Sequence, residues 1–193
     1  MYQLLHDKFI KNISISEEDF EFCKTIFIPK KLRKKQFLLQ EGDVAKYTAF
    51  VNKGITRTYT IDDKGIEHIL QFAMEGWWMG DIYSFLTDEP SLYNMEALED
   101  CELLLINKPS WDLLLEKIPA LERYFRLLVQ NNLIATQRRL MGSMSETAEA
   151  KYSKLLNEFP DAVQRVPQHM IASYLGITRE TLSRIRSQIA SRK

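Results

Sequence analysis

The chain has 193 residues, of which 45% are hydrophobic and 27% charged, and its formal net charge at pH 7 is zero. This is an ordinary composition for a globular protein of one domain or two small ones. No run approaches the roughly 18 apolar residues of a membrane span, and the N-terminus lacks the apolar core of a secretory signal. We therefore expect a cytoplasmic protein with no membrane partner.

Residues that could carry catalysis or bind metal are sparse. Cys23 and Cys101 form no Cys-x-x-Cys pair, and no cysteine or histidine cluster has the spacing of a zinc or iron–sulfur site. The sequence also lacks a Gly-x-Ser-x-Gly motif, a phosphate-binding loop and a framed pair of catalytic carboxylates. It thus predicts two buried free thiols, no metal, no cofactor and no catalytic residue.

Short helices are expected over residues 1–27, because Ser16 followed by three acidic residues is a typical helix start. Beyond them, glycines at positions 42, 54, 65 and 76 recur at intervals of 12, 11 and 11 residues. Strand-like runs occupy residues 36–40, 48–52, 56–61, 68–73 and 102–106, and residues 62–65 have the composition of a hairpin turn. Short strands at this spacing predict a compact antiparallel barrel or roll.

A long helix is expected over about residues 119–141, after a short helix opened by Pro109. Its first half is apolar on a broad front that includes Leu121, Tyr124 and Phe125. One face can cover the roll while another meets a second copy of the chain, so we expect a homodimer. The alternative is a helix that packs only on its own domain.

Residues 142–145 are a candidate hinge, and a further helix is expected over residues 146–159, ended by Pro160. Charge is distributed unevenly along the chain. Residues 151–193 hold 8 Lys and Arg against 3 Asp and Glu, whereas residues 1–150 hold 18 against 23. A basic C-terminal module on an acidic body favours a polyanionic partner at that end.

Two helices joined by a tight turn are expected over residues 167–190. The first runs from about Pro167 to Leu175, Gly176 supplies the turn, and Thr178 can cap the second helix. Leu182, Ile185 and Ile189 share one side of the second helix. The other side is polar within an arc of roughly 140°. The alternative is a solvated amphipathic helix after an ordinary helical hairpin.

The polar side of residues 178–190 carries groups that recognise base edges. Arginine can donate two bonds to guanine, and glutamate can accept one from cytosine N4. These residues lie in the first two turns, where a recognition helix meets bases in the major groove. The predicted DNA-binding residues are Gln168, Thr178, Arg179, Glu180, Ser183, Arg184 and Ser187, with Arg192 and Lys193 as candidate phosphate contacts.

Four stretches are distinctive: Glu41-Gly-Asp43, Asn52-Lys-Gly54, Gly76-x-x-x-Gly80-Asp81 and Leu175-Gly-Ile-Thr-Arg-Glu-Thr-Leu-Ser-Arg184. On them, nearly the whole chain resembles the Crp/Fnr family of bacterial transcription regulators. Residues 165–168 and 171–176 resemble the short members of the Bacteroidetes branch. The resemblance implies an α+β fold. In that fold an N-terminal antiparallel β-roll of the cyclic-nucleotide-binding type (a double-stranded β-helix) and a long dimer helix occupy residues 1–142. A winged-helix-like helix-turn-helix domain occupies residues 146–193.

The resemblance also implies an effector site, formed by Gly80, Asp81, Ile82, Ser91 and Leu92 with Arg138 of the long helix. In relatives that bind cyclic AMP, a Gly-Glu pair is followed about ten residues later by Arg-Ser, whose arginine clamps the cyclic phosphate. Here Asp81 is one methylene shorter and Ser91-Leu92 replaces Arg-Ser, so no cation meets the phosphate. We expect cyclic AMP to bind poorly, and the effector to be another small molecule or none.

The leading hypothesis is a homodimeric transcription regulator that binds an inverted repeat in double-stranded DNA, with RNA polymerase as a candidate further partner. The alternative is a sensor of a cyclic nucleotide or other small molecule whose DNA binding is weak or vestigial. An enzyme is a third class, and no motif supports it.

Overall fold

The computed structural model describes residues 1–191, and its contacts divide the chain into two compact units. The first unit comprises Met1–Thr60 and Gln71–Val129, and the second comprises Ile61–Leu70 and the residues from Gln130 onward. A hairpin tip in the first half of the sequence thus belongs to the C-terminal unit. No helix among the described residues is long and apolar enough to cross a membrane.

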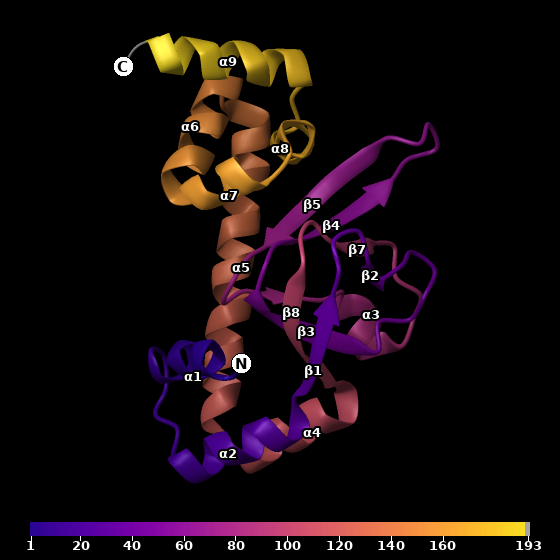
Figure 1. Ribbon diagram of the computed structural model, residues 1–193, viewed down its shortest axis with the longest axis vertical. Coiled ribbons are helices and arrows are strands. Elements are labelled where there is room, and N and C mark those ends of the chain that lie inside the picture. Colours follow the sequence, from indigo (N-terminus) through magenta and orange to yellow (C-terminus); the bar gives the residue numbers. More distant parts are fainter. Residues whose placement is uncertain (192–193) are drawn as a thin grey trace. The chain divides into compact units, whose positions relative to one another are not determined.

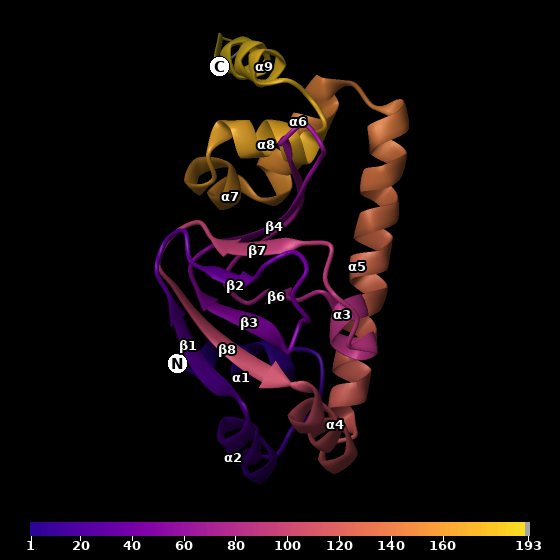
Figure 2. The ribbon, with the colours of Figure 1, turned by 90° about the vertical axis from the view of Figure 1, so that its right-hand side faces the viewer.

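Two antiparallel sheets of four strands each form a roll (Figures 1 and 2). One sheet has the order β1-β8-β3-β6 and consists of β1 (Ile28–Leu32), β3 (Tyr47–Lys53), β6 (Trp78–Met79) and β8 (Cys101–Asn107). The other has the order β2-β7-β4-β5 and consists of β2 (Phe37–Leu39), β4 (Thr56–Ile61), β5 (Glu67–Ala73) and β7 (Asn94–Ala97). The predicted α+β fold with an antiparallel roll is confirmed.

Apolar side chains that point inward from both sheets fill the roll. Val51, Met95 and Leu103 are no more than 1% exposed, as is Phe85 of the short helix α3 (Ile82–Thr87). Because full burial of a side chain of this size contributes about 1.5–3 kcal/mol, this cluster holds the two sheets together.

The N-terminal helices pack on one end of the roll in a second apolar cluster. They are α1 (Gln3–Ile10) and α2 (Glu17–Ile26). Ser16 caps α2, because its hydroxyl accepts a 3.0 Å hydrogen bond from the Asp19 amide, which confirms the predicted helix start. Leu5 and Phe9 of α1 are fully buried in this cluster.

Helix α4 (Lys108–Lys117) has Pro109 in its first turn as predicted, and the long helix α5 (Ala120–Ser145) follows it. The first turns of α5 bury Leu121, Tyr124 and Phe125 in the N-terminal cluster. The indole N–H of Trp78 donates to the Tyr124 hydroxyl at 3.1 Å. These contacts anchor the start of α5 to the first unit.

The second unit consists of the hairpin tip, the end of α5 and four short helices (Figure 1). The helices are α6 (Ala148–Glu158), α7 (Pro160–Arg165), α8 (Gln168–Leu175) and α9 (Arg179–Ser191). Helix α6 packs on the other three. Tyr152, Ile171 and Leu182 are at most 4% exposed and form the core of these helices.

One prediction at the start of this unit is wrong, and another is confirmed. Residues 142–145 are the last turn of α5, not a hinge. Within this turn the hydroxyls of Ser143 and Ser145 donate to the carbonyls of Leu140 and Met141. Helix α6 ends at Glu158, just before Pro160 as predicted. Pro160 also begins α7, since the first turn of a helix has no use for the amide that proline lacks.

Candidate nucleic-acid interface and effector site

Helices α8 and α9 are joined by a tight turn built on Gly176. This glycine is left-handed, with φ of +65°, and its amide donates to the Ser173 carbonyl at 3.0 Å. The Ile177 amide donates to the Ala172 carbonyl at 3.0 Å. Thr178 then caps α9, because its hydroxyl accepts a 3.1 Å bond from the Thr181 amide. The predicted turn and cap are confirmed.

The apolar side of α9 is anchored to the rest of the unit. Leu182 is fully buried and Ile185 is 6% exposed, while Ile171 and Leu175 of α8 are buried beside them. The ammonium of Lys151 on α6 donates to the Leu175 carbonyl at 3.0 Å, so it caps the C-terminal end of α8. These contacts fix which side of α9 remains in solvent.

The polar side of α9 is in solvent along its length. All seven predicted DNA-binding residues are exposed. Within residues 1–191, Arg179, Glu180 and Arg184 form no ion pair with another side chain, so their charged groups are available to a ligand. Gln168 is exposed at the start of α8, one helix away. Arg192 and Lys193 lie outside the described residues.

The loop and helix at residues 80–92 are closed by their own hydrogen bonds. Asp81 is 5% exposed and caps α3, accepting bonds from the Tyr83 and Ser84 amides at 3.1 and 3.2 Å. The hydroxyl of Ser91, which is 1% exposed, donates to the other carboxylate oxygen of Asp81 at 2.7 Å. Both oxygens of Asp81 are therefore engaged within the chain.

The remaining predicted effector residues are placed differently. Ile82 and Leu92 are 56% and 68% exposed, so neither lines an enclosed space within the roll. Gly80 lies against β3, where an added Cβ would be 2.7 Å from the Thr48 hydroxyl oxygen. Arg138 is exposed on the part of α5 that belongs to the second unit. The structure thus brings together only Asp81 and Ser91, which bond to each other.

A buried ion pair in the roll is absent from the sequence-based predictions. The Arg57 guanidinium on β4 donates to the Glu96 carboxylate on β7 at 2.8 Å from Nε, and the two residues are 5% and 8% exposed. The guanidinium carbon lies 3.9 Å from the centre of the Tyr59 ring. The register that pairs Arg57 with Glu96 also places Thr58 opposite Met95. The sequence did contain a signal for this pair, because Arg57 lies inside the predicted strand at residues 56–61.

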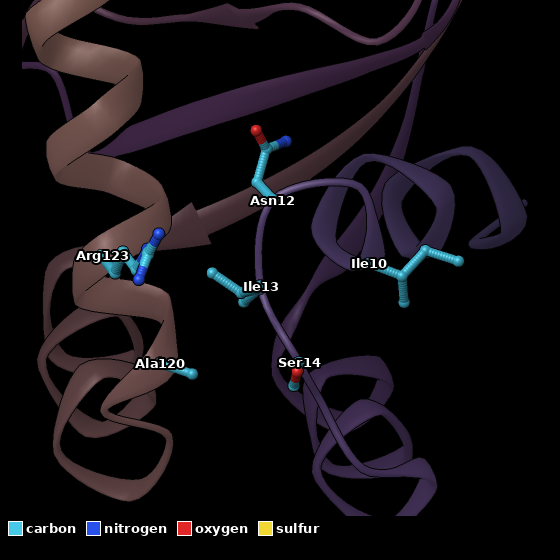
Figure 3. Close-up of a pocket in the computed structure, with 6 residues that line it drawn as sticks. All are labelled: Ile10, Asn12, Ile13, Ser14, Ala120 and Arg123. Carbon is cyan, nitrogen blue, oxygen red and sulfur yellow. The ribbon is translucent and has the colours of Figure 1, made fainter.

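An open hollow lies in the first unit between the α1–α2 loop and the start of α5. Figure 3 shows Ala120 and Arg123 opposite Asn12, Ile13 and Ser14. None of the predicted site residues lines it. In the part of the chain that the structure describes, no group of three or more His, Cys, Asp or Glu could hold a metal ion.

Comparisons with known proteins agree with this geometry. Residues 29–117 match the cyclic nucleotide-binding domain family. The chain is 25% identical to the regulatory protein HlyX of Actinobacillus pleuropneumoniae over 89% of this chain and 76% of that protein. It is 26% identical to the transcriptional activator protein anr of Pseudomonas aeruginosa, over 90% and 75%. The chain is a homologue of the Crp/Fnr regulators. The family resemblance predicted from the sequence is thereby confirmed.

The fold of this Crp/Fnr homologue is also found in solved structures. FixK2 from Bradyrhizobium japonicum superposes with a TM-score of 0.75 at 20% identity, covering 86% of each chain. The roll of the first unit is thus a cyclic nucleotide-binding domain, and the helices after it complete the fold of a Crp/Fnr regulator.

Proposed function

We propose that the chain is a homodimeric, sequence-specific DNA-binding transcription regulator whose α9 enters the major groove. The observation that carries this proposal is the division of α9 into two sides. Leu182 and Ile185 are buried, whereas Arg179 and Arg184 are exposed without ion pairs inside the described chain. A helix with one anchored side and one side of forked, short polar groups fits the edges of base pairs.

The roles of the polar residues follow from their chemistry. Arg179 and Arg184 are suited to guanine O6 and N7, and Glu180 to cytosine N4. Ser183 and Ser187 leave room for close approach, and the Thr178 hydroxyl and the Gln168 amide are suited to donate to phosphates beside the groove. HlyX and the anr protein are named as a regulatory protein and a transcriptional activator, which supports the same role here. The similarity to these two proteins also favours a regulator over an enzyme. It favours a cytoplasmic location as well.

The second half of α5 supports dimerisation. Leu133, Leu140 and Met144 are 57%, 56% and 75% exposed. At 100° per residue they share an arc of about 40°. Monomeric proteins rarely expose such an apolar stripe. The spacing of the three residues fits the 3.5-residue repeat of a coiled coil, so the same helix of a second copy would bury them. A symmetric dimer then matches an inverted repeat, with half-sites about 34 Å apart.

In this proposal residues 1–142 act as the sensing and assembling domain, and residues 146–193 act as the DNA-binding domain. The closed Asp81–Ser91 contact supports an effector site that has lost the chemistry for cyclic AMP. The effector is then another small molecule or none. RNA polymerase is the partner through which such a regulator would act on transcription.

The test is selection of double-stranded DNA from a random pool by the full chain, followed by footprinting. The proposal predicts one enriched sequence with two inverted half-sites. Leu133→Glu combined with Leu140→Glu should abolish the dimer in light scattering and weaken binding to the two-half-site duplex. If the pool shows no enrichment, the alternative of a sensor with vestigial DNA binding is favoured.

A further inference from the structure

A serine of the helix-turn-helix bonds to the tip of the β4–β5 hairpin. The Ser173 hydroxyl on α8 donates to the Glu67 carbonyl at 2.9 Å and accepts from the Ile69 amide at 3.0 Å. Glu67 and Ile69 belong to β5, and both lie with Ser173 in the second unit. One side chain thus bonds two alternate residues of a strand more than a hundred positions away.

These bonds satisfy groups that the sheet leaves unpaired. Strand β5 is the last strand in the order β2-β7-β4-β5, so one of its edges has no neighbouring strand. Proteins cover such an edge or blunt it, because its amides and carbonyls otherwise pair with other chains or with water. Here a helix covers the edge, and the hydroxyl of Ser173 acts as both donor and acceptor.

Arg139 of α5 reinforces the contact. Its guanidinium donates to the carbonyl of Leu70, the next residue along β5, and lies 4.8 Å from the centre of the Tyr174 ring. Tyr174 follows Ser173 on α8. A planar guanidinium can donate in its plane while its face lies against a ring, a geometry that a lysine ammonium lacks.

The hairpin tip is itself rigid. The Asp62 carboxylate accepts hydrogen bonds from the Lys64 and Ile66 amides, both at 2.9 Å, and its other oxygen contacts the His68 ring at 2.9 Å. The Gly65 amide donates to the Asp62 carbonyl at 2.8 Å, and this glycine has φ of +77°. These bonds tie the turn to the start of β5, so we expect the two to move together.

Ser173 is also linked to α9 through its backbone. The Ser173 carbonyl accepts from the Gly176 amide in the turn that positions Thr178, the cap of α9. A displacement of Ser173 therefore changes the turn between the two helices. The exposed face of α9 stays open while the hairpin is attached.

We propose that Ser173 and Arg139 form a latch that fastens the β4–β5 hairpin to the helix-turn-helix, and that the latched hairpin holds α9 ready for DNA. The effect on DNA rests on the proposed function, whereas the latch itself does not. Because β4 and β5 continue into the roll, a change in the roll that moved the hairpin would reach α9 through these two residues.

The latch is tested by hydrogen exchange on the full chain. Ser173→Ala removes both bonds, so the Ile69 amide should exchange about five- to tenfold faster, the factor expected for one lost hydrogen bond. The amides of α9 from Leu182 to Ile189 should also exchange faster. Ser173→Thr keeps the hydroxyl and should restore both regions. Ser153→Ala is the matched control, since Ser153 is a half-buried helical serine on α6.

The consequence for DNA is measured with the duplex that the full chain selects. Ser173→Ala and Arg139→Lys should each raise the Kd at least threefold, whereas Ser153→Ala should leave it unchanged. Unchanged exchange at Ile69 would show that no latch forms. A second outcome is faster exchange at Ile69 while exchange in α9 is unchanged and the Kd is unchanged or lower. This result would show that the latch does not control α9. If the unaltered chain binds no DNA, the proposed function fails, and exchange at Ile69 and α9 still decides whether the latch exists.

Discussion

The Ser91 hydroxyl donates to the Asp81 carboxylate at 2.7 Å, and both residues are almost fully buried. The resemblance to the Crp/Fnr family implies that relatives that bind cyclic AMP hold the nucleotide with groups at these two positions. Here the Asp81 and Ser91 side chains bond to each other. The amides of Tyr83 and Ser84 also donate to the Asp81 carboxylate. A ligand would have to break this contact and would find the Ser91 hydroxyl where its phosphate needs a cation.

We therefore predict that cyclic AMP does not bind. A cyclic phosphate keeps its charge at neutral pH, and burying that charge without a partner is costly. Isothermal titration calorimetry of the full chain should give no saturable heat at ligand concentrations up to about a millimolar. DNA binding should likewise be independent of cyclic AMP. A Kd in the low micromolar range would contradict this account of the site.

The Arg57–Glu96 pair gives a prediction about stability. Glu96→Leu leaves a buried arginine without its carboxylate, which should lower the free energy of unfolding by about 3–5 kcal/mol. Arg57→Met combined with Glu96→Leu should cost far less, because an apolar pair needs no counter-ion. Urea unfolding of both variants is the measurement. Equal losses in the single and the double variant would show that the charge pair is not the cause.

Two glycines with similar positive φ angles should differ in their tolerance of alanine. Gly54 has φ of +96°, and a Cβ there would lie 2.6 Å from the Cys101 sulfur and 2.9 Å from the Asp100 carbonyl oxygen. Gly42 has φ of +90° with nothing within 4 Å of such a Cβ. Gly42→Ala should therefore cost only the backbone strain, about 1 kcal/mol, and Gly54→Ala should cost about 1–3 kcal/mol more. Thermal unfolding of the two variants side by side checks the difference, which should vanish if packing at Gly54 plays no part.

The two cysteines should be unreactive while the chain is folded. Burial raises the pKa of the Cys23 thiol to about 12 and that of the Cys101 thiol to about 11, from 9.0. Only the thiolate reacts, so Ellman's reagent at pH 8 should label both residues in urea and neither in native buffer. The unfolded chain ionises first as pH rises past 9, so these groups also lower stability in alkali. Rapid native labelling would place a thiol at the surface.

Periodicity in the sequence was enough to predict most of the architecture. Strand β4 and the turn at residues 62–65 lie where the pattern placed them, and Ser16, Gly176 and Thr178 end or begin helices as their chemistry requires. These features depend on neighbouring residues, and local patterns report such features reliably.

Elements fixed by distant pairing were harder to predict. Strand β1 contains Pro29 and two lysines, and β6 has only two residues, so neither has a strand-like composition. Strand β7 was missed because its polar residues Asn94 and Glu96 are buried. The partner of Glu96 lies 39 positions away on β4, and only the register of the sheet brings the two together.

The candidate sites also divide into features set by neighbouring residues and features set by distant ones. The two sides of α9 follow from helical spacing, so the sequence predicted which residues are exposed there. The closure of Asp81 on Ser91 depends on how α3 and the following loop fold back. The sequence indicated a missing cation at this position but gave no sign of the hydrogen bond in its place.

Arg179→Ala tests most directly whether α9 reads DNA bases. The Kd of the unaltered chain and of the variant should be measured at one fixed salt concentration, on the selected duplex and on a scrambled duplex. Loss of one bidentate base contact is worth about 1–3 kcal/mol of discrimination. The ratio of the two Kd values should therefore fall by about five- to 150-fold, while Arg123→Ala, an exposed arginine outside the second unit, should leave it unchanged. If Arg179→Ala weakened binding to both duplexes equally, the residue would be a phosphate contact and base reading through it would be contradicted.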